Sequence, residues 1–407
     1  MAALVWIPPT VVIAVRLVIQ VYQHWGAVCM DFEYLIEQFG EAGTTALGGL
    51  VLGIMFGAFA QRSQFCLRAA VVEFWRGQIG KKVAIWLLTF SAAVAGTQAL
   101  ISGEMLDISD SRMLASYGSL SGAVIGGLLF GSGMVLARGC GARLLVLAAT
   151  GNLRALFSGL LFAAVAQASL RGILAPARDS VAGAWLLHDD GGLELISFLG
   201  WGEKTGIYIG LVCMVVAIYF GIRNKLNTWA WIGAVGVGCM VVGGWWFTYH
   251  MSYQTFEPTQ VESMTFTGPS ADTLMYFLTP GGAPMDFDVG LVPGVFIGSF
   301  LAAYFSRTLQ LQGFKDGSSM VRYIFGAVFM GMGGMLAGGC AVGAGLTGGS
   351  AFSITAWVAL AAMWAGAGLT DAVVDREFDG KTLPQRWLEK RNASQAGSEQ
   401  DTSVAVS

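Results

Sequence analysis

The chain has 407 residues, of which 55% are hydrophobic and 12% are charged, whereas soluble domains carry about 25% charged residues. Its 23 Lys and Arg against 26 Asp and Glu give a net charge of −3 with no basic excess, and its mean hydropathy is +0.63. These values exclude a soluble enzyme, a disordered chain and a nucleic-acid-binding protein, so we expect no enzymatic activity and no nucleic-acid partner. They predict an all-α polytopic protein embedded in a lipid bilayer.

Apolar runs predict about ten transmembrane helices. In chain order they lie near residues 4–29, 44–61, 83–102, 118–137, 155–174, 206–221, 228–249, 287–306, 322–338 and 351–370. The first run is interrupted by Pro8, Pro9 and Arg16 and lacks a convincing cleavage site. We therefore expect residues 1–43 to hold an extra N-terminal transmembrane helix and an outer loop, not a cleaved signal peptide.

Loop charges orient these spans. Lys and Arg gather at 62–82, 223–225 and 307–322, whereas residues 226–306 contain neither, and the loops at 31–43 and 250–286 are acidic. By the positive-inside rule the three basic loops face the cytoplasm. Ten spans then place both termini in the cytoplasm, and residues 371–407 form a polar cytoplasmic tail that is mostly disordered from about Arg376.

Two pairs of segments indicate an internal two-fold repeat. GLLFGSGMVLARGC (127–140) matches AVFMGMGGMLAGGC (327–340) at a separation of 200 residues. A second match, Gly49, Gly53 and Gly57 against Gly290, Gly294 and Gly298, has a separation of 241 and pairs Cys66 with Arg307. We predict a first repeat at 44–225 and a second at 226–370. The spans before Cys140 and Cys340 should run in opposite directions, so that their Gly–Cys loops enter the membrane from opposite faces.

The discontinuous Gly–Cys loops are candidate substrate-binding elements. A helix broken at Gly139–Cys140–Gly141 or at Gly339–Cys340 frees backbone N–H groups, and the N-terminus of a following helix is an anion site. Thiols buried in apolar surroundings stay neutral, and a neutral S–H group suits a soft sulfur atom better than a hard oxyanion. A row of such thiols predicts a pathway for a small sulfur-containing anion, which is held weakly enough to be released. The alternative is close helix packing by the glycines, with each cysteine acting as a small apolar residue.

The other cysteines suggest a second hypothesis. Cys66 lies between Arg62 and Arg68, which act either as positive-inside anchors or as groups that attract an anion. Covalent sulfur transfer needs an accessible thiolate, and Cys66 fits this requirement better than the buried loops. A membrane thiol or persulfide-transfer protein, or a sulfur sensor, is therefore the alternative function. A channel for water or a neutral solute would leave the paired cysteines unexplained.

The remaining cysteines and the histidines carry no predicted chemistry. Cys29, Cys213 and Cys239 lie in ordinary apolar runs, where we expect them to pack. No CxxC pair is present, and the three histidines are dispersed. We therefore expect no metal and no cofactor.

Four segments, at 49–77, 126–156, 263–303 and 325–351, resemble the YeeE/YedE family of sulfur transporters, with the motifs RSQFC (62–66), ARGCGA (137–142) and AGGCAVGAG (337–345). The resemblance covers roughly residues 45–370. It implies a bacterial inner-membrane carrier, exemplified by thiosulfate transporters, in which membrane cysteines hold the anion and a TusA-like cytoplasmic sulfur carrier receives it. This sequence departs from the family pattern at Arg138, where glycine is usual, at Ala344, and in having no cysteine between Met240 and Gly339.

The resemblance and the repeat together give the candidate site. The resemblance implies that Cys140 and Cys340 are the central pair and that Cys66 is the third cysteine of the pathway. We predict that the substrate passes from Cys340, nearer the outside, to Cys140 and then to Cys66 at the inner exit. The candidate substrate-binding residues are Cys66, Cys140, Cys340, Gly139, Gly141, Gly339 and Arg62.

Overall fold

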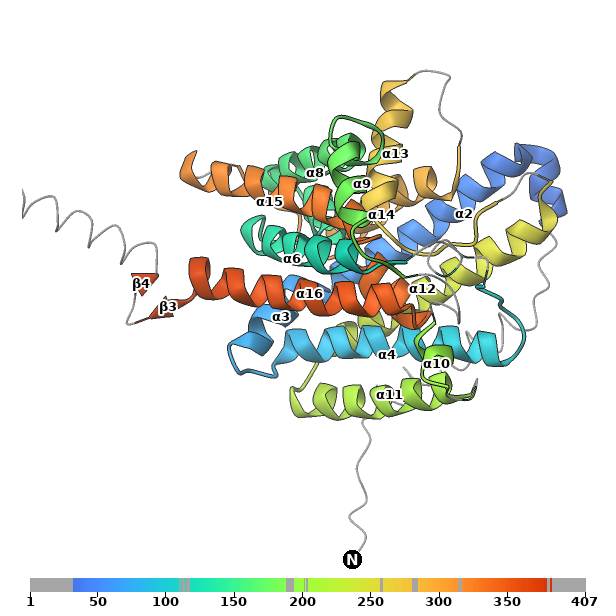
Figure 1. Ribbon diagram of the computed structural model, residues 1–407, viewed down its shortest axis with the longest axis horizontal. Helices are drawn as coiled ribbons and strands as arrows, with labels where there is room; N and C mark the ends of the chain where they lie inside the picture. Colours follow the sequence, from blue (N-terminus) through green and yellow to red (C-terminus); the bar gives the residue numbers. More distant parts are fainter. Residues whose placement is uncertain are drawn as a thin grey trace, which may run out of the picture.

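A computed structural model describes residues 32–109, 111, 114, 118–187, 194–200, 202, 204–256, 259–279, 285–313, 317–378 and 381–382. Within these ranges the chain is almost entirely helical, and long helices lie side by side in a bundle (Figure 1). The predicted span at 4–29 and the tail beyond residue 382 lie outside the described residues.

The long helices match the predicted spans that fall in the described ranges. They are α2 (Glu33–Ser63), α4 (Lys81–Ser102), α6 (Leu120–Leu136), α8 (Leu153–Arg171), α11 (Thr205–Arg223), α12 (Thr228–Gln254), α14 (Phe287–Phe305), α15 (Gly317–Leu336) and α16 (Ile354–Thr370). In the described part of the chain, 8 helices are long and apolar enough to cross a membrane, and Met320–Leu336 is a shorter apolar helix. The prediction of an all-α, multi-pass membrane protein is confirmed.

Shorter elements connect these helices. They are α3 (Leu67–Trp75), α7 (Gly141–Ala149), α9 (Ala175–Ala182), α10 (Leu195–Phe198), α13 (Thr267–Leu278) and the π-helices η1 (Gly343–Gly348) and η2 (Asp371–Asp375). Two small antiparallel pairs, β1 (Gly118–Ser119) with β2 (Leu186–Leu187) and β3 (Glu377–Phe378) with β4 (Lys381–Thr382), complete the described structure.

Two runs of helices have the same order of long and short elements. The first run is α2, α3, α4, α6, α7 and α8, and the second is α12, α13, α14, α15, η1 and α16. Their contacts correspond as well. Helix α7 packs on α14, and its counterpart η1 packs on α4. Helix α8 packs on α15, and its counterpart α16 packs on α6. Helix α11 lies between the two runs in sequence and packs on α4 at the edge of the bundle (Figure 1).

The helices that precede the two Gly–Cys loops are antiparallel, as the loop charges predict. A Cβ on Gly126 of α6 would lie 2.6 Å from the carbonyl oxygen of Gly333 in α15, and one on Gly133 would lie 2.7 Å from that of Gly326. The two contacts are equivalent in the repeat, because Gly126 corresponds to Gly326 and Gly133 corresponds to Gly333 at the separation of 200 residues. Small residues allow such close backbone approach in a membrane, where helix association depends on packing.

The match at 241 residues has a different origin. Helices α2 and α14 are parallel, and a Cβ on Gly53 would lie 2.5 Å from the carbonyl oxygen of Leu291, while Gly294 contacts Leu50 in the same way. The two glycine series match because they face each other, whereas the element order pairs α2 with α12 and α14 with α4. The counterpart of Cys66 is therefore Phe266, which caps α13 as Cys66 caps α3, and the pairing with Arg307 was wrong.

Two segments expected outside the spans are helical. Helix α2 already begins at Glu33, within the expected outer loop, and a glycine kink at Gly40, with φ of 73°, breaks it. Glycine adopts this conformation without a Cβ penalty. Residues 371–375, expected to start the polar tail, form η2, where Asp371 accepts hydrogen bonds from the Arg76 guanidinium at 3.0 and 2.8 Å. Hydropathy alone does not reveal such ion pairs.

The glycine contact between α2 and α14 can be tested with a matched pair of alanine substitutions. Gly53→Ala should lower the stability by about 1–3 kcal/mol, because the new methyl group forces two backbones apart. Gly159→Ala in α8 adds the same methyl group where no atom lies within 4 Å, and it should leave the stability unchanged or raise it by up to about 1 kcal/mol through helix propensity. Thermal unfolding of the detergent-solubilised proteins checks both. Equal midpoints for the two variants would contradict the proposed packing.

Candidate functional site

The two Gly–Cys loops are short breaks between helices. Helix α6 ends at Leu136 and α7 begins at Gly141 with Cys140 as its N-cap, while Cys340 follows α15 and precedes η1. Both breaks start with the same turn, in which the N–H of Gly139 donates to the Met134 carbonyl at 3.0 Å and that of Gly339 to Gly334 at 2.9 Å. This six-to-one hydrogen bond closes a helix C-terminus when the preceding residue is left-handed. The predicted discontinuity is therefore present in both loops.

The thiol of Cys340 is surrounded by hydrogen-bond donors. Its side chain is buried, with 1% exposure, and its Sγ accepts the N–H of Gly343 at 3.4 Å. The backbone N–H groups of Val342 and Phe266 and the hydroxyl of Thr265 also hydrogen-bond this sulfur. Loop residues from α13 and from the start of η1 thus meet at one sulfur atom.

The thiol of Cys140 has a similar environment on the other loop. It is equally buried, at 1% exposure, and it accepts a hydrogen bond from the backbone N–H of Arg143. Arg143 is three residues after Cys140, as Gly343 is three residues after Cys340. The first turn of each short helix therefore directs a backbone donor at its own cysteine.

The structure brings the three predicted cysteines together. Cys140 interacts electrostatically with both Cys66 and Cys340, and Cys66 is half-buried at the N-terminus of α3. The N–H of Phe266, at the start of α13, reaches the same cluster through Cys340. The N-termini of α3, α7 and α13 and the loop before η1 thus converge, and the positive ends of helix dipoles favour an anion at such a place.

The other predicted residues have varied surroundings. A Cβ on Gly339 would lie 3.0 Å from the Ala344 nitrogen, one on Gly141 would lie 3.1 Å from the Phe162 ring, and one on Gly139 would have only ordinary contacts at 3.4 Å. The Arg62 guanidinium lies 4.1 Å from the centre of the Trp229 ring in α12, a cation–π contact. Arg68 forms an ion pair with Asp375 at 3.2 Å. The cysteines that we expected to pack, Cys213 and Cys239, are half-buried, and Cys29 lies outside the described residues.

Arg138, the first departure from the family pattern, is conformationally unusual. Its φ is 58°, and its counterpart Gly338 has φ of 76°. A left-handed conformation costs a residue with a Cβ about 1–2 kcal/mol and costs glycine almost nothing. The turn therefore needs the left-handed backbone that glycine supplies at Gly338, and at Arg138 the chain adopts it with a residue that carries a Cβ.

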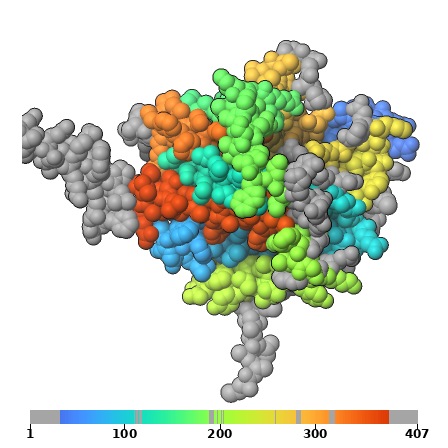
Figure 2. All heavy atoms as spheres, viewed as in Figure 1, coloured from blue at the N-terminus to red at the C-terminus, as the bar shows by residue number. Residues whose placement is uncertain are grey.

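Each Gly–Cys loop borders a cavity on its own side of the bundle. The Gly338 cavity, about 460 Å³, is lined by Gly338 and Ala344 and by Arg178 and Asp179 of α9. Helix α9 packs on α6, α8 and α15 and covers part of the face shown in Figure 2. The Arg138 cavity, about 130 Å³, holds the equivalent positions Arg138 and Leu144 together with Arg154. The two cavities thus differ more than threefold in volume.

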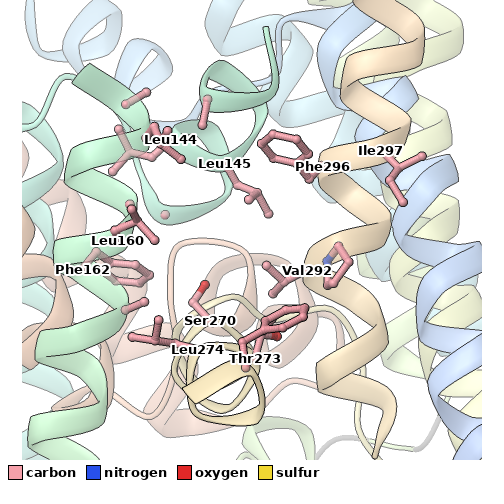
Figure 3. Close-up of a pocket in the computed structure, with 18 residues that line it drawn as sticks. Leu144, Leu145, Leu160, Phe162, Ser270, Thr273, Leu274, Val292, Phe296 and Ile297 are labelled. Atoms are coloured by element: carbon pink, nitrogen blue, oxygen red, sulfur yellow. The ribbon is translucent and has the colours of Figure 1, made fainter. Parts of the chain in front are cut away.

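A third cavity, of about 350 Å³, lies behind α7 and is almost wholly apolar. Figure 3 shows Leu160 and Phe162 of α8 facing Val292 and Phe296 of α14, with Leu144 and Leu145 of α7 and Ser270, Thr273 and Leu274 of α13 closing the ends. Leu156 and Ala163 of α8 line it too. Counted from the N-caps of the two helices, Asn152 and Ser353, the equivalent positions in α16 are Trp357 and Trp364. Those two tryptophans pack against Phe90, Trp86 and Phe74 with ring centres 5.2 to 5.6 Å apart, so the corresponding space in the other half is filled.

Several site residues were missed by the sequence analysis. Thr265 and Phe266 would have been found by applying the separation of 200 residues to Cys66. Lys82 and Arg143 interact electrostatically with Cys66 and Cys140 respectively. Lys82 was counted only as a loop charge, and Arg143 has no sequence signal other than its position three residues after Cys140.

Comparison with known proteins identifies the family of this chain. A family model described as sulphur transport matches residues 62–369, which include all three clustered cysteines. The chain belongs to this family. The resemblance to YeeE/YedE sulfur transporters is thereby confirmed.

Curated members of the family include two relatives that are named thiosulfate transporters. TsuA of Escherichia coli (strain K12) is 26% identical over 338 residues, covering 78% of this chain and 91% of that protein. TsuA of Spirochaeta thermophila (strain ATCC 700085 / DSM 6578 / Z-1203) is 25% identical over 332 residues, covering 76% and 93%. The similarity therefore extends over nearly the whole length of both relatives.

The strain at Arg138 predicts an ordering of two variants. Arg138→Gly and Arg138→Ala both remove the side chain's charge, but only glycine fits the left-handed turn without cost. We expect Arg138→Gly to be more stable than Arg138→Ala by about 1 kcal/mol. Thermal unfolding in detergent measures the difference. If the alanine variant were equally stable, the turn would not require a left-handed residue.

Proposed function

We propose that this protein imports thiosulfate, or a related small sulfur-containing anion, across the bacterial inner membrane through a pathway lined by thiols. The observation that carries the proposal is the convergence of Cys66, Cys140 and Cys340 at the starts of short helices. Membership of the sulphur transport family and similarity to proteins named thiosulfate transporters support the substrate class.

The chemistry of the site suits a divalent anion with one soft and several hard atoms. Thiosulfate carries a terminal sulfur and oxygens, and backbone N–H groups such as that of Gly343 are donors that oxygen accepts well. A buried neutral thiol is a weak S–H donor that suits the terminal sulfur. Because each contact is weak, the anion can move from one thiol to the next instead of being trapped.

The path we propose begins in the Gly338 cavity and proceeds past Cys340, Cys140 and Cys66. The larger volume of the Gly338 cavity supports it as the side that admits substrate. Loop charges support the orientation that we propose, with that end of the bundle and both termini in the cytoplasm, since Lys and Arg gather where α2 ends and α4 begins. The repeat boundaries at 44–225 and 226–370, flanked by an N-terminal span and a cytoplasmic tail, belong to the same proposal.

On the cytoplasmic side we propose a soluble acceptor. The family resemblance suggests a TusA-like sulfur carrier. Arg68 and Arg322, which form ion pairs with Asp375, lie at the end of the bundle that we propose to be cytoplasmic.

A second candidate function, covalent persulfide transfer, rests on Cys66. This thiol is half-buried, unlike the other two of the cluster, and the ammonium of Lys82 interacts with it electrostatically. Partly exposed cysteines in electropositive surroundings are the reactive ones. In this reaction the Cys66 thiolate would attack the outer sulfur of thiosulfate, break its S–S bond and release sulfite, which leaves a persulfide on Cys66. Mass spectrometry of the purified protein after exposure to thiosulfate separates the candidates: a persulfide on Cys66 supports covalent transfer, and an unmodified chain supports transport without a covalent step.

The transport proposal predicts that Cys140→Ala and Cys340→Ala each abolish thiosulfate-dependent growth of a host that lacks sulfate uptake. Each change removes a thiol from the middle of the pathway, where the anion has no other soft contact. Cys213→Ala, in α11 and outside the cluster, is the matched control and should grow as the wild type does. Growth on thiosulfate as sole sulfur source is the measurement, with membrane protein levels checked by immunoblot. Normal growth of both pathway variants at normal protein levels would overturn the proposal.

A further inference from the structure

Two positive charges lie next to the thiols on one side of the cluster. Arg143 is in the first turn of α7, three residues after Cys140, and interacts electrostatically with it. Lys82 is the second residue of α4 and interacts electrostatically with Cys66 and with Arg143. The two cations thus lie within electrostatic range of each other and of two sulfur atoms.

Neither cation is neutralised by an ion pair within the described residues. The ion pairs found there are Arg68 and Arg322 with Asp375, Arg76 with Asp371, and Arg178 with Asp179. The Lys82 ammonium donates to the amide oxygen of Gln64 at 3.1 Å, a neutral partner. Glu73 interacts electrostatically with Lys82 without forming an ion pair, and its Oε2 accepts the backbone N–H groups of Lys82 and Val83 at 2.9 and 3.0 Å. One carboxylate thus stands against two positive charges.

Arg143 is also incompletely hydrogen-bonded. Its Nη1 atom is buried and finds no acceptor among the described residues. A buried N–H donor without an acceptor is costly, and a second positive charge beside it adds repulsion. An anion between the two side chains would supply the missing acceptor and remove the repulsion.

The other side of the cluster lacks these charges. The residue three positions after Cys340 is Gly343, where Arg143 follows Cys140. The second residue of α14, the counterpart of Lys82 in α4, is Asp288. The positive pair is therefore confined to one end of the row of thiols.

We propose that Lys82, Arg143 and Cys66 form a second anion-binding station, which receives the substrate from Cys140 before its release. The two cations hold the oxygen atoms of the anion and the Cys66 thiol contacts its terminal sulfur. This inference rests on the proposed transport function and assigns two positioning cations to it. It also gives Cys66 a role that needs no covalent chemistry.

The test combines uptake with binding. Uptake of radiolabelled thiosulfate is measured in cells that express the wild type, Lys82→Gln, Arg143→Gln or the double variant, and thiosulfate binding is measured by calorimetry on the purified proteins. Each single variant should weaken binding by about tenfold and raise the KM for uptake, because a charge-assisted hydrogen bond to the anion is lost. Lys81→Gln is the matched control, since Lys81 carries the same charge on the adjacent, exposed position of α4.

Two further comparisons separate a binding role from a structural one. Arg143→Lys keeps the charge and should retain most of the uptake that Arg143→Gln loses. Cys66→Ala should lower the preference of the purified protein for thiosulfate over sulfate, while Lys82 and Arg143 still bind both anions.

The outcomes distinguish this inference from the proposed function. If the wild type takes up no thiosulfate, the transport proposal fails. If the wild type transports but Lys82→Gln, Arg143→Gln and the double variant bind and transport as it does, the station is overturned and transport stands. If Arg143→Gln does not fold, Lys82→Gln and Arg143→Lys test the second anion-binding station instead. Wild-type binding by Lys82→Gln, together with loss of uptake in Arg143→Lys, would then also overturn the station.

Discussion

The central constraint on this fold is that broken backbone cannot face lipid. Hydrocarbon offers no hydrogen-bond partner, so every free N–H or C=O group within the bilayer must be satisfied by protein or lie in a polar cavity. Helices α3, α7 and α13 are too short to cross a membrane, and each begins inside the bundle. The N–H groups at their starts therefore require acceptors, and the sulfur atoms of Cys140 and Cys340 accept some of them.

The glycine-rich long helices make this interior possible. The contacts of Gly53 with α14 and of Gly126 with α15 bring backbones closer than larger residues allow. These closely packed pairs of long helices surround the short helices, whose N-termini meet between them. Glycine thus has two roles in this chain, because it lets the long helices pack closely and it forms the breaks before α7 and η1.

Much of the fold could be predicted because bilayer thickness fixes span length. Hydropathy located the long helices of the described chain, and the Gly–Cys motifs located two of the breaks. The starts of α3 and α13 were not predicted as breaks, because Cys66 and Phe266 cap them without a glycine pair. The early start of α2 and the helical η2 were missed since they depend on a kink at Gly40 and on an ion pair of Asp371 with Arg76.

The candidate site could be predicted only in part. The three cysteines were found from their motifs, and their proximity is a property of the fold that spacing along the chain could not give. The glycine patterns of α2 and α14 suggested a wrong pairing of repeats. Helices that pack against each other can carry the same spacing of small residues as helices related by duplication. Lys82 and Arg143 were overlooked because a sequence does not tell which lysine or arginine near a membrane boundary turns inward.

The apolar cavity behind α7 has a consequence for how the bundle can deform. On one half, Trp357 and Trp364 with Phe90, Trp86 and Phe74 occupy the space between α3, α4 and α16, so any inward shift there must displace close-packed rings. On the other half, α7 and α13 border a pocket of about 350 Å³ whose outer side is formed by exposed apolar side chains, Leu160, Phe277 and Phe296 among them. Displacement of the segment that carries Cys140 therefore depends on the lipid chains that meet this open face, whereas displacement of the segment that carries Cys66 requires packed aromatic rings to move.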